Sequence, residues 1–368
     1  MPVLKITFLL PSAASVPIGG FKVVYGFSST LVHRGHSVSV IHPARVGPLS
    51  LLQVGRTIVG LCARGLGLKE TWKPISWHTP DRRVRLLWRP FIHDQFIPAG
   101  DAVIATAWNT AERVATLSSE KGKKFYLIQN QEELFDDASP TRARATWKLP
   151  LRKMTTGQWL VNLGSKMGEN VDYVGQGFDY DSPTFEVDKP IRQRPPSVAM
   201  LYHTATWKGS AEGIRALELT KRIIPSLRAT LFGVPSRPAT LPAWISYLQT
   251  PTSTQLRNLY NSVAVFLSPS WVEGCALPPG EAAQCGAALC LTDIGGHADY
   301  AQQGITALLS PPRDIGALAT NLQRLLTDAR LRETLAQNGH ERIATFSWKR
   351  SADLLEAVLL RGLESPIR

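Results

Sequence analysis

The chain has 368 residues, of which 44% are hydrophobic and 19% charged, and this balance excludes a largely disordered protein. The length exceeds what one ordinary core needs and suits two domains of about 150–200 residues each. No stretch of about 18 consecutive apolar residues occurs, so no transmembrane helix is expected. The apolar run from Ile6 to Leu10 is shorter than the core of a signal peptide, and we expect it to be a buried strand.

The net charge of +12 is accompanied by two basic zones in the first half of the chain. Arg45 to Arg89 holds nine Lys and Arg against two acids, and Ala138 to Gly168 holds six and none. These zones could face an anionic membrane, a phosphorylated acceptor, nucleic acid or only solvent. No nucleic-acid-binding module accompanies them, so no nucleic-acid partner is expected. Residues 48–73 are amphipathic and basic, which is consistent with peripheral contact with an anionic membrane or with a helix packed on a sheet.

The first half of the chain alternates strand and helix patterns, which predicts a parallel sheet with crossover helices. A strand at 4–10 leads into a loop with Gly19 and Gly20, and a helix at 21–34 is expected to end before Gly35. Further strands are expected at 37–41, 101–106, 124–129 and 171–174, and further helices at 110–121 and 159–163.

A Pro-rich stretch separates this half from a second strand–helix series. Strands are expected there at 198–202, 228–234, 263–267 and 287–292, and helices at 211–224, 252–260, 314–327, 329–338 and 347–360. The predicted organisation is a first domain of residues 1–180, a linker of 181–196, a second domain of 197–345 and a C-terminal helix of 346–368. Two such domains form a cleft between the carboxyl ends of their strands, where open α/β sheets bind ligands.

The densest chemical signal follows the strand that ends at Leu267. Glu273 and Gly274 lie in the turn after this strand, and a helix is expected to begin at the Pro pair that follows, with Glu281 in its first turn. The N–H groups and the positive end of such a helix suit a diphosphate. The two carboxylates could then accept hydrogen bonds from sugar and ribose hydroxyls. The alternative is an ordinary loop followed by a capped helix.

This stretch, Glu273-Gly-Cys-Ala-Leu-Pro-Pro-Gly-Glu281, resembles the E-x7-E element of family 4 glycosyltransferases. The resemblance implies that Glu273 contacts sugar hydroxyls, that Glu281 holds the ribose and that the intervening backbone binds the diphosphate. The residues expected to bind the donor through this backbone are Gly274, Cys275, Ala276 and Leu277. Cys275 and Ala276 replace an aromatic residue and a Gly of the usual pattern, but a contact made through backbone N–H groups should survive both changes.

A second motif lies just after the first strand of the second domain. Tyr202-His-Thr-Ala-Thr-Trp-Lys208-Gly209 resembles the R-x-x-x-x-K-G element of the same family, which implies that Lys208 neutralises the donor phosphates. His203 occupies the place of the usual Arg, so phosphate binding would depend more on Lys208, or the role of the Arg would lie elsewhere. Glu273, Lys208 and His203 are the expected catalytic residues.

Two glycine pairs also match the family. Thr292-Asp-Ile-Gly-Gly-His297 resembles its T-D-x-G-G turn, and paired glycines suit a close approach to a ligand or a tight reversal. Gly19 and Gly20 match its first glycine-rich loop and are expected to lie against the donor. They form no G-x-G-x-x-G fingerprint, which argues against a dinucleotide-dependent dehydrogenase.

The acceptor side of the cleft is expected at the ends of two strands of the first domain. The residues expected to contact the acceptor or the sugar are Asn109, Gln129, Asn130 and Glu132. Glu132 could instead be an acid of a solvated loop.

No metal or other cofactor is expected. Asp179-Tyr-Asp181 matches the D-x-D triplet of another glycosyltransferase class, but it lies at the Pro-rich linker. The four cysteines form no C-x-x-C pair and have no His partner at zinc spacing, so reduced thiols are expected, as in a cytosolic protein. They are Cys62, Cys275, Cys285 and Cys290.

The resemblance implies a GT-B fold, in which two Rossmann-like α/β domains face a central cleft and the C-terminal helix crosses back to the first domain. The implied function is that of a retaining, metal-independent glycosyltransferase of the bacterial surface-polysaccharide type. It would move a hexosyl group, with rhamnosyl and mannosyl as candidates, from a nucleotide-sugar donor to a glycan or lipid-linked acceptor. The implied location is the cytoplasm, including the inner face of the cytoplasmic membrane. Two alternatives are a GT-B-fold sugar-nucleotide epimerase and a nucleotide-sugar-binding protein without activity.

Overall fold

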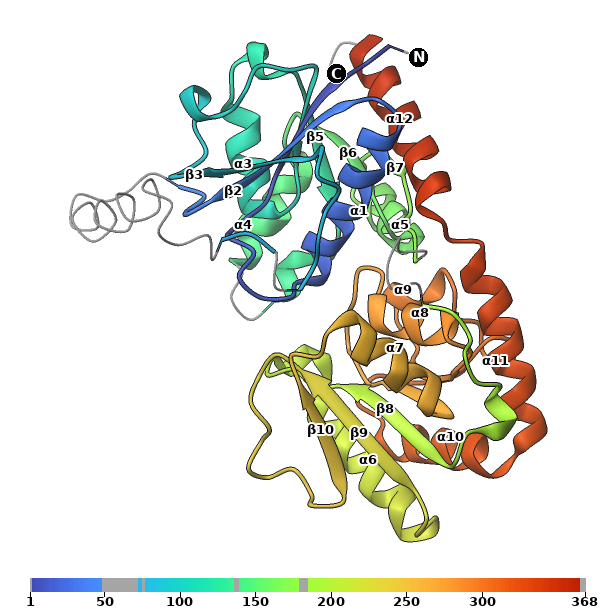
Figure 1. The fold of residues 1–368 in the computed structure, drawn as a ribbon. Helices are drawn as coiled ribbons and strands as arrows, with labels where there is room; N and C mark the ends of the chain where they lie inside the picture. The colour runs from blue at the N-terminus through green and yellow to red at the C-terminus, as the bar shows by residue number, and fades with distance from the viewer. Residues whose placement is uncertain (1, 48–71, 75–76, 136–138, 179–184, 365–368) are drawn as a thin grey trace.

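Two α/β domains face each other, and helices at the C-terminal end of the chain run along one side of both (Figure 1). The computed structural model describes residues 2–47, 72–74, 77–135, 139–178 and 185–364. The expectations for residues 48–71 and for the D-x-D triplet at 179–181 therefore lie outside the described residues.

The first domain contains a sheet of seven strands among the described residues, in the order β3-β2-β1-β4-β5-β6-β7, with every pair parallel. Its strands are β1 (Lys5–Leu9), β2 (Ser37–Pro43), β3 (Arg85–Arg89), β4 (Ala102–Ala105), β5 (Lys123–Ile128), β6 (Arg152–Thr155) and β7 (Val171–Tyr173). Its helices are α1 (Gly19–His33), α3 (Trp108–Thr116), α4 (Pro140–Ala145) and α5 (Gln158–Lys166).

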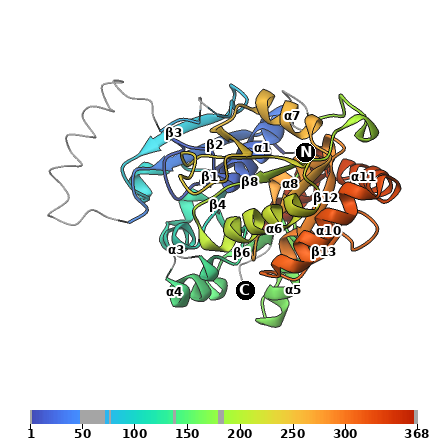
Figure 2. The same ribbon diagram turned by 90° about the horizontal axis from the view of Figure 1, so that it is seen from below.

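The second domain contains a parallel sheet of six described strands in the order β10-β9-β8-β11-β12-β13. These strands are β8 (Ser197–Leu201), β9 (Arg228–Gly233), β10 (Ile245–Gln249), β11 (Val265–Ser268), β12 (Ala288–Thr292) and β13 (Leu308–Ser310). The helices are α6 (Ser210–Ile223), α7 (Ser253–Ser262), α8 (Leu277–Gln284), α9 (Gly295–Ala298), α10 (Ile315–Thr327) and α11 (Ala329–Ala344). Helices α6 and α10 pack together against the sheet (Figure 2).

Local sequence explains why these elements begin and end where they do. The central strands are buried along nearly their whole length, as in sheets covered by helices on both faces. Gly35 follows α1 with a φ of 92°, which confirms it as the stop of that helix. Thr252 and Gln255 form a capping box at the start of α7. In both sheets the order reverses beside the first strand of the domain, which places the ligand-binding crevice at the carboxyl ends of β1 and β8.

Helix α12 (Trp348–Glu364) crosses back and packs against α1 of the first domain. Glu356 of α12 is buried and lies 2.7 Å from the His36 ring nitrogen Nε2, and it also pairs with Arg34. Trp348 occupies the space beside Gly26, where a Cβ would lie 2.2 Å from its ring. The predicted crossing of the last helix is confirmed, and a glycine in α1 makes room for it.

Several elements differ from the prediction. The helix expected at 110–121 ends at Thr116 and is followed by a separate 3-10 turn, Ser119–Lys121. Strands β3, β6, β10 and β13 and the short helices α4 and α9 were not predicted, because their sequences are too short to show a long apolar run or a helical period. Within β6, the buried Lys153 is accommodated by the carbonyls of Leu149 and Leu151 and by an ion pair with Glu169. Tertiary partners therefore permit a strand that the sequence pattern does not indicate.

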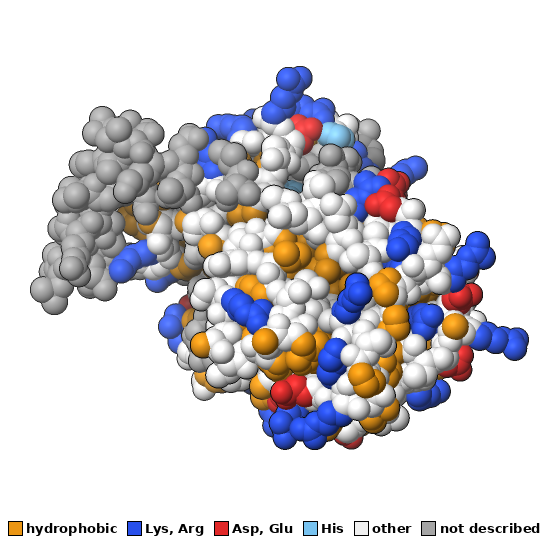
Figure 3. All heavy atoms as spheres, turned by 60° about the horizontal axis from the view of Figure 1, so that its bottom comes forward, with side chains coloured by type: hydrophobic (Ala, Val, Ile, Leu, Met, Phe, Trp, Pro, Cys, Tyr) orange, Lys and Arg blue, Asp and Glu red, His pale blue; other side chains and the backbone are white. Residues whose placement is uncertain are grey.

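The described residues include no helix that is both long and apolar enough to cross a lipid bilayer. Figure 3 shows one face of the molecule, on which Lys and Arg side chains are spread singly rather than gathered in one patch.

Candidate active site

A small pocket lies at the carboxyl ends of β8 and β11, and the residues that line it belong to the second domain. Its lining includes Leu201, Lys208, Ser268, Ser270, Glu273 and Pro278. The parallel strands end at one edge of the sheet, and α8 begins beside the pocket, so its first N–H groups and its positive end are close to the same space. The sequence-predicted elements thus meet at one site.

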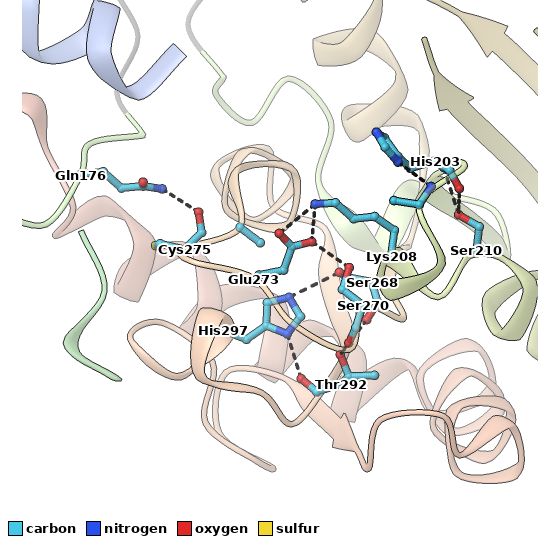
Figure 4. A network of polar contacts seen from close by, with 12 residues as sticks. Gln176, His203, Lys208, Ser210, Ser268, Ser270, Glu273, Cys275, Thr292 and His297 are labelled. Carbon is cyan, nitrogen blue, oxygen red and sulfur yellow. Dashed lines mark hydrogen bonds and ion pairs between the residues drawn. The ribbon is translucent and has the colours of Figure 1, made fainter. Parts of the chain in front are cut away.

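An ion pair between Lys208 and Glu273 forms one wall of this pocket (Figure 4). The Lys208 Nζ lies 2.7 Å from Oε1 and 2.8 Å from Oε2 of Glu273, and the Ser270 hydroxyl donates to Oε1 at 2.8 Å. The ammonium also lies 4.3 Å from the centre of the Trp207 ring. Because carboxylate and ammonium are both largely removed from water, they hold each other in a defined position at the pocket.

His203 lies at the end of β8, with its ring Nδ1 accepting a hydrogen bond from the Ala205 N–H at 3.0 Å. Burial of the ring and the nearby charge of Lys208 lower the pKa of His203, while Glu273 acts in the opposite direction. The imidazole is therefore neutral near pH 7. A neutral ring does not replace the positive charge of the Arg in the family pattern, and Lys208 remains the cation at the pocket.

The loop between Glu273 and α8 is held by hydrogen bonds to three successive carbonyls. The Gly274 carbonyl accepts from the Trp159 indole at 2.7 Å, the Cys275 carbonyl from the Gln176 amide at 3.1 Å, and the Ala276 carbonyl from the Tyr300 hydroxyl at 3.1 Å. Trp159 and Gln176 belong to the first domain, so both domains define the shape of this loop.

The N–H groups of the same loop do not all remain available. The Ala276 N–H donates to the Gly296 carbonyl at 3.2 Å, so this group, expected to bind the diphosphate, is already used within the second domain. Among the described residues, the N–H groups of Cys275 and Leu277 have no such partner. Burial raises the pKa of the Cys275 thiol well above its usual range, so the thiol stays protonated.

Glycines of the two turns are required by packing. A Cβ on Gly296 would lie 2.3 Å from the Glu273 carbonyl oxygen, and one on Gly295 would lie 2.5 Å from the Trp159 ring. The two glycines of the T-D-x-G-G turn carry no side chain, and this leaves room for Glu273 beside Gly296 and for Trp159 beside Gly295. His297, which directly follows the two glycines, is buried and donates from its Nδ1 to the Thr292 carbonyl at 2.8 Å.

Glu281 is buried in the first half of α8, with its side chain only 4% exposed. The Lys22 ammonium lies 2.6 Å from its Oε1, and the Tyr260 hydroxyl donates to its Oε2 at 3.2 Å. Lys22 belongs to the first turn of α1, so this ion pair joins the two domains. A cation near a helix N-terminus is electrostatically unfavourable, and this was the signal in the sequence that could have identified Lys22.

The first glycine pair also lies at the domain boundary. Gly19 begins α1 and lies beside Leu277, since a Cβ added to it would be 3.7 Å from the Leu277 side chain. Gly20 faces the Gln129 amide, which donates to the Thr106 carbonyl at 3.3 Å. Residues expected on the donor and acceptor sides are therefore adjacent here.

The remaining acceptor-side residues follow β4 and β5. Asn109 lies in the first turn of α3, and its buried side-chain oxygen has no hydrogen-bond partner among the described residues. Asn130 accepts from the Gln131 N–H at 2.8 Å. Glu132 accepts from the Trp108 N–H at 2.6 Å and from the Tyr126 hydroxyl at 3.0 Å, so it stabilises the start of α3.

An aromatic contact that was not predicted from the sequence joins the two domains. Phe135 of the first domain stacks on Trp207, with ring centroids 4.9 Å apart and planes inclined by 15°. Trp207 in turn lies against Lys208, so this contact connects the first domain to the lysine of the pocket. An aromatic residue directly before the lysine of the motif was the signal in the sequence for it.

The second domain has a sequence that is recognisable on its own. Residues 181–342 match the family described as glycosyl transferases group 1. The group 1 match covers the Lys208 motif, the Glu273–Glu281 element and the turn before His297. The prediction of a glycosyltransferase sequence in this half of the chain is confirmed.

Curated relatives are similar over limited stretches. A D-inositol 3-phosphate glycosyltransferase of Salinispora arenicola is 31% identical over 126 residues, which are 33% of this chain and 28% of the relative. The O-antigen biosynthesis protein RfbC of Myxococcus xanthus is 26% identical over 290 residues, 75% of this chain and 22% of the relative. An O-antigen chain mannosyltransferase B of Escherichia coli is 29% identical over 106 residues, 29% of this chain and 27% of the relative. The chain thus spans about a quarter of the length of these relatives.

Solved structures share the fold of the whole chain. Anabaena Alr3699/HepE in complex with UDP-glucose superposes with a TM-score of 0.71 at 15% identity, covering 97% of this chain and 100% of that one. TarM, which a second matching structure names as an S. aureus protein, superposes with a TM-score of 0.72 at 10% identity, covering 99% of each chain. The predicted GT-B fold is confirmed.

Proposed function

We propose that the chain is a retaining glycosyltransferase that moves a hexosyl group from a nucleotide-sugar donor to a glycan or lipid-linked acceptor without a metal ion. The observation that carries this proposal is the Lys208–Glu273 ion pair in the pocket beside the start of α8. A cation, a carboxylate and helix N–H groups at one point match the phosphates and the hydroxyls of such a donor.

In the proposed reaction, an acceptor hydroxyl oxygen forms a bond to C1 of the donor sugar while the bond from C1 to the diphosphate oxygen breaks. The nucleoside diphosphate leaves with the electron pair and takes the proton of the acceptor hydroxyl, on the face from which the acceptor attacks, so the configuration is retained. Lys208 and the N–H groups of Cys275 and Leu277 stabilise the charge that develops on the leaving diphosphate. Glu273 holds the sugar hydroxyls, and positioning across the cleft supplies much of the rate.

The sugar class is proposed from relatives. The names of two relatives, O-antigen chain mannosyltransferase B and the serotype-specific mannosyltransferase WbdA, favour a mannosyl donor and a polysaccharide acceptor.

No group of three His, Cys, Asp or Glu side chains suited to a metal is found in the part of the chain that the structure describes. We therefore assign charge neutralisation to Lys208 and the helix start.

A screen of UDP-, GDP- and dTDP-sugars, with and without EDTA, tests the proposal. We expect saturable binding of one donor and slow release of its nucleotide that EDTA does not prevent. Binding without turnover, also in the presence of polysaccharide and lipid-linked acceptors, would favour a binding protein, and no binding would refute the assignment. Loss of turnover in EDTA that added Mg²⁺ restores would refute the metal-free mechanism.

Two variants connect this result to the pocket. Lys208→Gln should lower turnover on the order of 10²-fold, because it removes a cation that stabilises the leaving group. Glu273→Gln should also lower turnover, because it removes the carboxylate proposed to hold the sugar hydroxyls, and Glu333→Gln, at an exposed acid of α11, is its matched control. Turnover by Lys208→Gln close to that of the unmodified protein would contradict the role of Lys208.

A further inference from the structure

The loop that begins α8 receives two of its three carbonyl contacts from the other domain. Trp159 lies in the first turn of α5 and Gln176 lies after β7, yet both donate to this loop, at 2.7 Å and 3.1 Å. Gln176 is buried and Trp159 is partly buried between the two glycine turns of the second domain. These are specific contacts, because each donor is the side chain of a residue that reaches across the domain boundary.

Because each carbonyl belongs to the same planar peptide as the N–H of the next residue, a contact that fixes the carbonyl also fixes the direction of that N–H. In a trans peptide the carbonyl and the N–H of the next residue point in opposite directions. Holding the Gly274 carbonyl toward Trp159 therefore turns the Cys275 N–H away from the first domain's indole. The Leu277 N–H is oriented from within the second domain, because Tyr300 holds the Ala276 carbonyl of the same peptide.

The Ala276 N–H, which lies between those of Cys275 and Leu277, shows that the loop is held rigidly. The Cys275 carbonyl is held by Gln176, and the opposite group of the same peptide, the Ala276 N–H, donates to the Gly296 carbonyl at 3.2 Å. Both sides of this peptide are therefore satisfied by protein, one from each domain. Rotation of the loop would break contacts with the first domain and with the Gly296 turn together.

We propose that Trp159 is a positioning residue that orients the Cys275 N–H toward the diphosphate of the donor only when the domains are closed, and that Gln176 supports it by holding the next peptide of the same loop. This inference rests on the proposed function and adds to it a link between closure and donor affinity. Open domains would leave the Gly274 and Cys275 carbonyls to water, and the peptide that carries the Cys275 N–H would lose the contact that fixes its direction. The second domain alone would then hold the nucleoside but bind the diphosphate less well.

The test compares Trp159→Phe, Gln176→Leu and the unmodified protein in calorimetric titrations with UDP, GDP and dTDP, each measured beside its own nucleoside. Trp159→Phe keeps most of the ring and removes the N–H. Because one hydrogen bond contributes about 1 kcal/mol, we expect each variant to weaken nucleoside diphosphate binding between about fivefold and tenfold. Nucleoside binding should stay within twofold, because no phosphate is involved.

Trp244→Phe is the matched control, since this Trp lies in the second domain with its ring beside the Lys221 ammonium, 4.9 Å away. It should leave both affinities unchanged. Equal weakening of nucleoside and nucleoside diphosphate, or no weakening of either, would overturn the positioning role, and the proposed function would still stand. If the unmodified protein binds none of the three diphosphates, the proposed function fails and the inference fails with it.

Discussion

Gly274 is a position at which a single added methyl group should clash directly with the backbone of the other domain. A Cβ at Gly274 would lie 1.6 Å from the backbone oxygen of Gln129 and 2.8 Å from its carbon. Gln129 directly follows β5 in the first domain, and its backbone cannot move aside as a flexible side chain could. The Gly274→Ala variant must therefore relieve this contact by moving the domains apart or by distorting the loop.

The size of the effect follows from the contact distance. Cβ atoms essentially never approach another heavy atom closer than 3.0 Å, so the two backbones must separate by about 1.4 Å at this point. A misplacement of about 1 Å in a catalytic site can cost 10²-fold in rate. We expect kcat to fall on the order of 10²-fold, equivalent to about 2.7 kcal/mol of transition-state stabilisation. The affinity for the nucleoside diphosphate should fall by no more than about tenfold, because the second domain still holds the nucleoside.

The assay combines steady-state kinetics with thermal unfolding. Gly316→Ala is the matched control, because Gly316 lies in α10 and the nearest atom to its added Cβ would be the Asp314 carboxylate at 3.5 Å. This control should keep full activity and gain up to about 1 kcal/mol from helix propensity. A Gly274→Ala protein whose kcat stays within twofold of the parent would refute the reasoning. A large fall in its unfolding temperature would mean that the loop, rather than domain closure, absorbs the methyl group.

Further predictions concern Glu281 and the buried His42. Glu281→Ala should raise the donor KM between about tenfold and a hundredfold, because hydrogen bonds to a charged group contribute about 1.5–3 kcal/mol, and an unchanged donor affinity would rule out its contact with ribose. Burial lowers the pKa of His42 from 6.5 to about 4, so the unfolded chain takes up the proton first as the pH falls. The stability contributed by the neutral ring is thus complete above pH 6.5 and is lost as the pH falls toward 4, on the order of 3 kcal/mol in all. Urea unfolding at pH 7.5 and pH 5 should show a weaker pH dependence for His42→Phe than for the parent, and equal slopes would contradict the assignment.

The sequence by itself determined those features that depend on local order along the chain. The strand–helix alternation, Gly35 as a helix stop, and the placing of Lys208, Glu273 and Glu281 at the ends of strands or the start of a helix all follow from patterns within a few residues. The motif resemblance added their expected roles. Such features were predictable because short-range periodicity and turn chemistry reflect the local backbone.

Only the tertiary structure decided how the two domains use these residues. Lys22 and Glu281 are 259 positions apart, and Trp159 and Gly274 are 115 positions apart, so no local pattern could pair them. The glycines of the second domain's turns were read as sites of close ligand approach or tight reversal, whereas in the fold they make room for Glu273 and for Trp159. The physical reason is that steric fit between two separately folded surfaces depends on their relative placement, which long-range packing sets and local propensity does not.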